Sequence, residues 1–212
     1  MTDMKKKLEL RTREVGPWPM NTFVLVSPTS NESVLIDPGA EPETLGEMLA
    51  GSRPVGIVLT HTHPDHVGAL EEMRGRLNVP LMAHAGPHYG GMKLHADRHL
   101  ATGDTVQVGA HSLRVFAAPG HIDDQICLAL NDDNRVIVGD TIFEGGPGKT
   151  WTMAGFRTTL KTLRDVVMPW PDDTVCYPGH GPHFRLGDQR VAIESFLAKD
   201  HGDFYGDATW DM

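Results

Sequence analysis

One stretch of the chain runs from an apolar segment directly into a cluster of side chains of the metal-binding kind: Val55-Gly56-Ile57-Val58-Leu59-Thr60-His61-Thr62-His63-Pro64-Asp65-His66. The apolar half is short and rich in β-branched residues, which is typical of a buried strand. Pro64 disfavours helical geometry at His63 but suits the first turn of a helix, so Asp65 and His66 are expected on that turn. Imidazoles and carboxylates gathered this densely predict a divalent-metal site.

Three other apolar runs end in residues of the same kind. They are followed by Pro119-Gly120-His121, Gly139-Asp140 and Pro178-Gly179-His180. Proline ends a strand and glycine lets the backbone turn sharply, so each side chain is expected to point past the end of its strand. An isolated Pro-Gly-His is more often an ordinary turn, but the repetition of this pattern favours one shared site.

Together the four strand ends supply a set of seven metal-binding side chains: His61, His63, Asp65, His66, His121, Asp140 and His180. This set is close to what two four- or five-coordinate zinc ions need when one carboxylate bridges them and water completes each shell. We therefore predict a dinuclear site that holds zinc, with iron or manganese as alternatives. The other histidines are expected on the surface or in ordinary hydrogen bonds: His84, His88, His95, His99, His111, His183 and His201.

Length and composition indicate a globular protein. The chain has 212 residues, of which 40% are hydrophobic and 22% charged, and it contains no apolar run long enough to cross a membrane. We expect one domain over residues 1–212 that ends in a short helix and tail. The net charge of −9 argues against nucleic acid or an anionic membrane as a partner, so a small-molecule substrate is expected, and a homodimer stays open.

Two further features concern the cellular location. The basic run Lys5-Lys6-Lys7 is not followed by the apolar segment of a secretory signal, so the cytoplasm is expected. Cys127 and Cys176 each lie inside a strand-like run, which favours buried free thiols over a disulfide.

The hydrophobic pattern also predicts the main secondary structure. Strands are expected at residues 22–26, 33–37, 55–60, 79–83, 113–117, 135–138 and 174–177. Helices are expected at residues 42–49, 67–77 and 188–197, and residues 86–100 are expected to form a looser segment.

The motifs together resemble the metallo-β-lactamase-fold superfamily, and specifically its glyoxalase II-like branch, the hydroxyacylglutathione hydrolases and their relatives. The resemblance covers residues 21–180 and rests on Thr60-His61-Thr62-His63-Pro64-Asp65-His66, Pro119-Gly120-His121, Gly139-Asp140-Thr141-Ile142-Phe143 and Pro178-Gly179-His180-Gly181-Pro182. It implies an α/β fold, a four-layer αββα sandwich in which two mixed sheets face each other and the metals lie at one sheet edge.

The resemblance also implies a role for each ligand. His61, His63 and His121 would hold the first metal, Asp65, His66 and His180 the second, and Asp140 would bridge the two. A metal-bridging hydroxide would then attack a thioester or another small acyl ester. Asp65 and Asp140 are therefore the expected catalytic residues, and Asp65 would also orient the hydroxide.

Two segments beside the ligands bear on the substrate. In glyoxalase II enzymes a Gly-x-Gly-Lys stretch follows the Gly-Asp-Thr-x-Phe motif, and its lysine receives a glutathione carboxylate. Lys149 occupies that place, so it is the expected substrate-binding residue, with a solvated loop lysine as the alternative.

Nucleotide binding is not expected, because a P-loop needs glycine where Phe143 stands. Asp123 and Asp124 replace part of the family's His-Thr-x-Gly pattern and would repel an anionic substrate.

Two other activities fit the same residues. One is a persulfide dioxygenase that uses a single iron held by His61, His121 and Asp140. The other is a lactonase or β-lactamase-like hydrolase. A binding module without catalysis is the least favoured interpretation, because every ligand position is filled.

Overall fold

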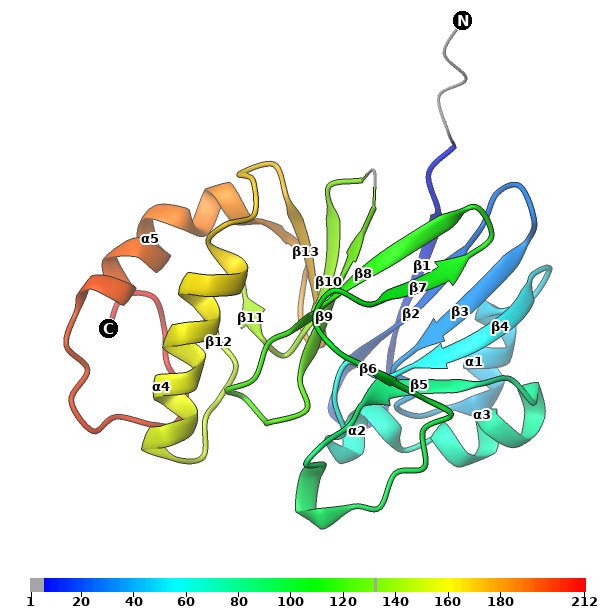
Figure 1. Ribbon diagram of the computed structural model, residues 1–212, viewed down its shortest axis with the longest axis horizontal. Helices are drawn as coiled ribbons and strands as arrows, with labels where there is room; N and C mark the ends of the chain where they lie inside the picture. The colour runs from blue at the N-terminus through cyan, green and yellow to red at the C-terminus, as the bar shows by residue number, and fades with distance from the viewer. Residues whose placement is uncertain (1–5, 132) are drawn as a thin grey trace, which may run out of the picture.

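Two mixed β-sheets face each other at the centre of the computed structural model, which describes residues 6–131 and 133–212 (Figure 1). The first sheet consists, in spatial order, of β1 Glu9–Val15, β2 Met20–Val26, β3 Glu32–Ile36, β4 Arg53–Val58, β5 Leu81–His84 and β6 Arg98–Leu100. The second consists of β14 Phe184–Arg185, β13 Val175–Pro178, β10 Arg135–Gly139, β9 Ile126–Leu130, β8 His111–Ala117 and β7 Thr105–Val108. Lys5 and the first residues of the expected domain lie outside the described residues.

Helices cover the outer face of each sheet. The first sheet carries α1 Pro42–Met48, α2 Pro64–Val67 and α3 Leu70–Leu77, and the second carries α4 Met153–Thr162, the π-helical turn η2 Leu163–Val167 and α5 Leu186–Ala198 (Figure 1). A 3-10 turn, η1 Tyr89–Gly91, and a small ribbon of β11 Ile142–Phe143 and β12 Gly146–Pro147 complete the fold. The predicted four-layer αββα sandwich is therefore confirmed.

The alternation of side chains along the strands explains the layers. In β2, Phe23 points into the core between the sheets and Val24 into the core beneath α1 and α3. In β10, Ile137 joins the central core and Val138 the core beneath α4 and α5. Successive strand residues face opposite sides, so a strand covered on both sides must be apolar throughout. This is why the strands were recognisable as continuous apolar runs.

Every predicted strand is present and ends within two residues of its expected bounds, and so do the helices predicted at residues 42–49 and 188–197. The prediction of a single helix at residues 67–77 is wrong, because the helix is interrupted between α2 and α3. The backbone N–H of Ala69 donates to the carbonyl of Pro38 at 2.9 Å instead of continuing the helix. Gly68 packs so closely on Gly39 that a Cβ would lie 2.3 Å from the Gly39 oxygen.

The sheet topology gathers strand ends at one edge of the molecule. The pairs β3 and β4 in the first sheet and β10 and β13 in the second are parallel, so their carboxyl ends lie together. Two backbone hydrogen bonds join the sheets there, from Ile126 N to Thr60 O at 2.8 Å and from Asn21 N to Gly179 O at 2.6 Å. Ligands at the carboxyl ends of parallel strands can therefore converge from both sheets.

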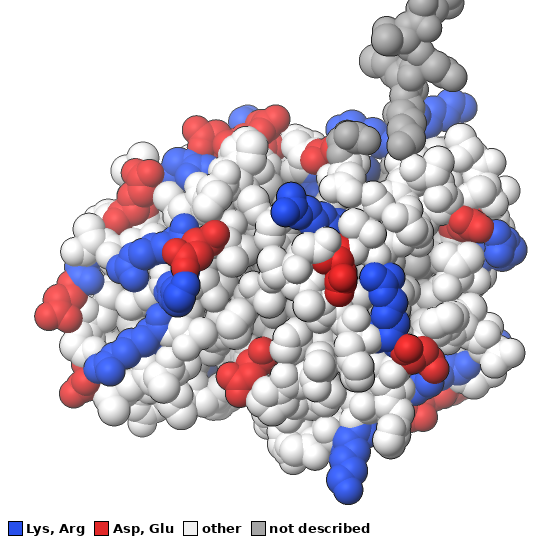
Figure 2. Space-filling view, viewed as in Figure 1, with Lys and Arg blue, Asp and Glu red and all other residues white. Residues whose placement is uncertain are grey.

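The charged side chains of opposite sign are interspersed on the face shown in Figure 2. Several form ion pairs across elements, such as Arg74 with Asp97 at 3.2 Å. Among the helices of residues 6–131 and 133–212, none has both the length and the apolar character needed to span a bilayer.

Cys127 in β9 and Cys176 in β13 are buried free thiols, as predicted. Burial raises the pKa of Cys127 to about 12, against a smaller opposing effect of its hydrogen bond with Thr141, and burial also raises the pKa of Cys176.

Only the thiolate reacts with disulfide reagents. We expect neither thiol to react with Ellman's reagent at pH 8 in the folded protein, and both to react in guanidinium chloride. Rapid labelling of the folded protein would contradict this packing.

Candidate metal centre

The seven predicted ligands converge at the edge where the two sheets meet. They follow β4 or lie on α2 in the first half of the chain, and follow β8, β10 and β13 in the second half: His61, His63, Asp65, His66, His121, Asp140 and His180. Pro64 occupies the start of α2 and His63 is its extended N-cap, as predicted. Asp65 and His66 consequently project from the first helical turn.

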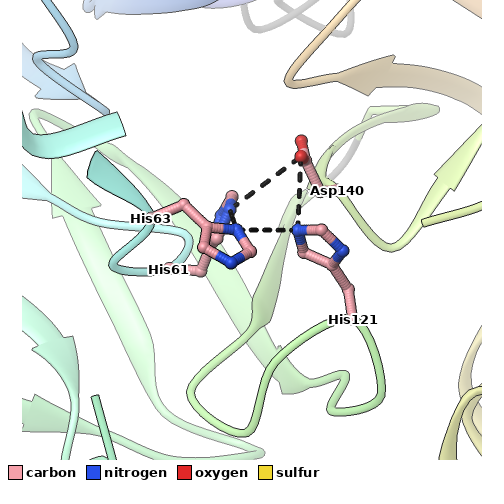
Figure 3. Close-up of side chains that lie close together, drawn as sticks. All are labelled: His61, His63, His121 and Asp140. Carbon is pink, nitrogen blue, oxygen red and sulfur yellow. Dashed lines mark hydrogen bonds and ion pairs between the residues drawn. The ribbon is translucent and has the colours of Figure 1, made fainter. Parts of the chain in front are cut away.

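Three imidazoles and one carboxylate form a first group (Figure 3). The Nδ1 of His63 lies 3.1 Å from Nε2 of His61 and 2.8 Å from Nε2 of His121. The Oδ2 of Asp140 lies 3.9 Å from Nε2 of His61 and 3.5 Å from Nε2 of His121. All four side chains are buried.

Asp140 also faces a second group, formed by Asp65, His66 and His180. The Nε2 of His180 lies 3.1 Å from Oδ2 of Asp65 and 3.6 Å from Oδ2 of Asp140. The Nε2 of His66 lies 4.0 Å from Oδ2 of Asp65 and 3.6 Å from Oδ1 of Asp140. The carboxylate of Asp140 therefore stands between the groups, where the resemblance expected a bridging ligand.

Hydrogen bonds on the outer side orient four of the five imidazoles in the same way. In each, Nδ1 is within hydrogen-bond distance of an oxygen, so Nδ1–H donates outward and Nε2 points into the centre. The four pairs are His61 with Thr60 Oγ1 at 3.1 Å, His66 with Asp37 Oδ2 at 3.0 Å, His121 with Lys149 O at 2.7 Å and His180 with Pro19 O at 2.8 Å. His63 is the exception, since its Nδ1 faces the other two imidazoles.

The residues present fit two divalent cations. The Nε2 of His66 and the Oδ1 of Asp140 are buried and have no hydrogen-bond partner among the described residues. Such groups cost free energy unless a partner compensates their desolvation, and a cation between them would do so. Gly179 preserves the space, because a Cβ there would lie 2.2 Å from Oδ1 of Asp140. Imidazole and carboxylate ligands accept zinc, iron and manganese alike.

The glycines before the ligands have two different roles. Gly120 and Gly139 adopt positive φ angles of 141° and 49°, so the predicted sharp turns are present. A Cβ on Gly120 would also lie 2.7 Å from the backbone of Thr159. Gly179 does not have a positive φ, so the sharp glycine turn predicted there is absent. Glycine is needed at this position because Asp140 and His66 approach too closely for a side chain.

Asp37 is the main residue that sequence analysis did not assign to the site. It is fully buried at the end of β3, where Oδ1 accepts from Thr60 N at 2.7 Å and Oδ2 accepts from Thr60 Oγ1 at 2.6 Å. Asp37 lies close enough to His61 and His66 to be a ligand itself. Because its oxygens already bind Thr60 and the Nδ1 of His66, we assign Asp37 as a positioning residue. Its place at the end of a predicted strand did not reveal this role, because the pairing of β3 with β4 is seen only in the structure.

The two groups differ in protonation. Burial lowers the pKa of His63 and of His121 to about 4, and burial with the neighbouring imidazoles lowers the pKa of His61 well below its usual value. Burial alone would also lower the pKa of His180, but its hydrogen bond to Asp65 and the charge of Asp140 raise it to about 9. At neutral pH the imidazoles of the first group are therefore uncharged, whereas the second group contains a protonated imidazole.

The two aspartates that follow His121 have different environments. Asp124 is buried, and its Oδ2 accepts from Thr62 Oγ1 at 2.6 Å. The same Thr62 oxygen accepts from the backbone N–H of Tyr89 at 2.9 Å, and the Tyr89 ring lies 4.7 Å from the ring of His63. Asp124 thus anchors the η1 segment, whereas Asp123 is exposed. The expected repulsion of anions can come from Asp123 alone.

Lys149 contributes to the centre through its backbone. Its carbonyl accepts from Nδ1 of His121, while its Nζ lies 2.9 Å from Oδ2 of Asp207 and 5.1 Å from the ring centre of Trp151. Its expected contact with a substrate carboxylate stays a prediction, and that contact would compete with Asp207.

The fold and the site define a class of αββα proteins with a histidine and aspartate centre at one sheet edge. The family model described as "Metallo-beta-lactamase superfamily" matches residues 15–180. The chain therefore belongs to the metallo-β-lactamase superfamily, whose members are mostly hydrolytic enzymes that bind metal ions.

Individual relatives refine this placement. The chain is 30% identical over 194 residues to "Probable metallo-hydrolase YqgX" of Bacillus subtilis (strain 168), covering 82% of this chain and 91% of that protein. It is 32% identical over 162 residues to "Hydroxyacylglutathione hydrolase" of Rhodopseudomonas palustris (strain BisB5), covering 74% of this chain but only 61% of that protein. Among solved structures, TTHA1623 in a di-iron-bound form is similar with a TM-score of 0.72 and 28% identity, covering 85% of this chain and 96% of that one.

Asp37→Asn should weaken metal binding at the second group by about 10- to 100-fold, the usual effect of losing an outer partner of a metal-binding histidine. Asparagine tolerates the left-handed backbone at this position, where φ is 51°. Its NH₂ group replaces one of the two accepting oxygens, so it cannot accept all three hydrogen bonds from Thr60 N, Thr60 Oγ1 and His66 Nδ1. A competition titration with a chromogenic zinc chelator measures the affinity. Asp173→Asn, at an exposed position outside both groups, is the control, and equal affinities in the two variants would refute the assignment of Asp37.

Metal loading should release protons unequally. At pH 7.5, His63 and His121 are above their pKa of about 4 and bind a cation without losing a proton, whereas His180 is below its pKa of about 9 and must lose one. Affinity at the second group should therefore rise with pH up to about 9, and affinity at the first should fall only in acid. Calorimetry in phosphate and in Tris buffer measures the release. Equal proton release for both equivalents would contradict this assignment.

Proposed function

We propose that this protein is a metal-dependent hydrolase that holds two divalent ions, with zinc as the expected metal, and cleaves a thioester or another small acyl ester. The observation that carries the proposal is the Asp140 carboxylate, which faces His61 and His121 on one side and His66 and His180 on the other. A carboxylate shared by two groups of ligands is the arrangement that a two-metal hydrolase needs.

The chain's own residues have distinct tasks in this reaction. Two ions held at these ligands would supply a Lewis acid for the substrate carbonyl and an activated water near neutral pH. Asp65 is only partly buried and its Oδ2 faces the centre beside His180, so it can accept a hydrogen bond from the attacking water and orient it. Asp37, Thr60 and the carbonyl of Lys149 hold the imidazoles in place before substrate arrives.

A cavity of about 450 Å³ opens beside His121. It is bounded on one side by the segment 87–90 and on the other by the start of α4 and the residues before it, 151–155. A scissile carbonyl at the metal centre would therefore place one substituent of the substrate in this cavity. A thiolate leaves without prior protonation, so a thioester requires little acid catalysis from the surrounding residues.

His121→Ala and Asp140→Ala should each lower kcat/KM for a thioester by at least about 10²-fold, because each removes a ligand on which the charge stabilisation depends. Metal content should fall in both variants, and circular dichroism should show a retained fold. His183→Ala changes an exposed histidine stacked on Tyr177 and is the matched control. Unchanged turnover in both ligand variants would refute the site.

Metal analysis of natively expressed protein, combined with a substrate screen, separates this function from its competitors. The proposal expects two ions per chain and hydrolysis of thioesters without oxygen uptake. One iron per chain with oxygen uptake on a persulfide would instead establish a dioxygenase. Turnover confined to lactones or β-lactams would keep the two-metal hydrolysis but refute the ester class.

A further inference from the structure

Large apolar side chains are exposed around the cavity beside His121. Tyr89 and Trp151 line it and are 45% and 56% exposed, and Met92 and Met153, which follow them closely in the sequence, are also exposed. Apolar side chains gathered in this way mark a surface that another molecule covers. Because these side chains lie beside the candidate metal centre, we infer that the molecule is the substrate.

Both aromatic rings lie next to the first group of ligands. The ring centre of Tyr89 is 4.7 Å from that of His63, and the ring centre of Trp151 is 6.4 Å from it. The rings are held by their own segments, since Tyr89 N donates to Thr62 and Thr152, next to Trp151, caps α4 by accepting from Gly155 N. Two aromatic rings on anchored backbone segments therefore lie beside His63.

The charges at this cavity would disfavour an anionic substrate. Asp123 is exposed and lines the cavity, and the residues that line it in the described part of the chain include no lysine or arginine. The cation of Lys149 lies beside Trp151 but is paired with Asp207 at 2.9 Å. A carboxylate entering the cavity would meet Asp123 and would have to displace Asp207 from Lys149.

We propose that the cavity beside His121 binds an uncharged apolar group of the substrate, and that Asp123 and Asp207 select against substrates that carry a carboxylate there. This inference rests on the proposed hydrolase function and names the substrate class of the same site. Asp123 acts by direct repulsion, whereas Asp207 acts by occupying Lys149. The pair formed by Lys149 and Asp207 is exposed, so its removal should change selectivity only several-fold.

Binding of non-hydrolysable thioethers tests the inference without turnover. S-hexyl-N-acetylcysteamine and S-(5-carboxypentyl)-N-acetylcysteamine differ mainly in a terminal carboxylate, and isothermal titration calorimetry measures their Kd. We expect the uncharged thioether to bind at least about 10-fold more tightly. Asp123→Asn should reduce that preference by about 5-fold, the size of one nearby charge in partly exposed surroundings. Glu194→Gln, which makes the same charge change on the exposed face of α5, should leave it unaltered.

A second pair of variants tests the masking of Lys149. Asp207→Asn should tighten binding of the carboxylate-bearing thioether several-fold, and adding Lys149→Met should abolish that gain. Trp151→Ala should weaken binding of the uncharged thioether by about 10-fold, which is the expected loss for removing a stacked apolar contact. Equal binding of the two thioethers, or no response to Asp123→Asn and Asp207→Asn, would overturn the inference.

The matched hexanoyl and 5-carboxypentanoyl thioesters of N-acetylcysteamine then separate the two proposals. Hydrolysis of both at equal kcat/KM would support the proposed function and refute the selectivity. Failure to hydrolyse either, together with the expected difference in thioether binding, would refute the hydrolase and keep the assignment of the cavity.

Discussion

The convergence of six polar side chains around one carboxylate, Asp140, is the constraint on which the rest of the structure depends. Its oxygens face imidazoles that follow strands of both sheets, so the two sheets must keep one relative position at this edge. The parallel strand pairs bring the ligands to one edge, and the backbone hydrogen bonds from Ile126 to Thr60 and from Asn21 to Gly179 join the sheets there. The apolar core between the sheets supplies the stability that permits such a buried polar centre.

A buried polar centre is stable only when its outer hydrogen-bonding positions are filled. Four imidazoles are anchored through Nδ1, and their acceptors come from four separate parts of the chain. Two inward atoms, Nε2 of His66 and Oδ1 of Asp140, have no hydrogen-bond partner among the described residues, and a cation would satisfy both. The same hydrogen bonds that stabilise the apo protein therefore determine where the metals would bind.

Metal ligands are shared by members of a superfamily with different substrates, so the specificity of this chain must come from what surrounds its centre. Here the surroundings are two exposed aromatic rings, one exposed carboxylate and a lysine paired with an aspartate from the C-terminal tail. Hydroxyacylglutathione hydrolases are among the relatives, but in this chain the Lys149 ammonium is already paired with Asp207. In the proposed hydrolase, the ligands would account for the reaction and the surrounding charges for the choice of substrate.

Most of the fold and all of the ligand types were predictable from sequence, because both depend on local patterns. A strand buried on both faces must be apolar, and the residue that follows it at a Pro-Gly or Gly turn must leave the sheet. Asp37, the anchoring of Tyr89 by Asp124 through Thr62, and the pairing of Lys149 with Asp207 were not predictable. Each joins residues that lie far apart in the sequence, so no periodicity records it. The sequence by itself determined which side chains could bind a metal, and the tertiary structure decided which groups orient them and which charge a substrate meets, because electrostatic and hydrogen-bonding partners are set by distance in space.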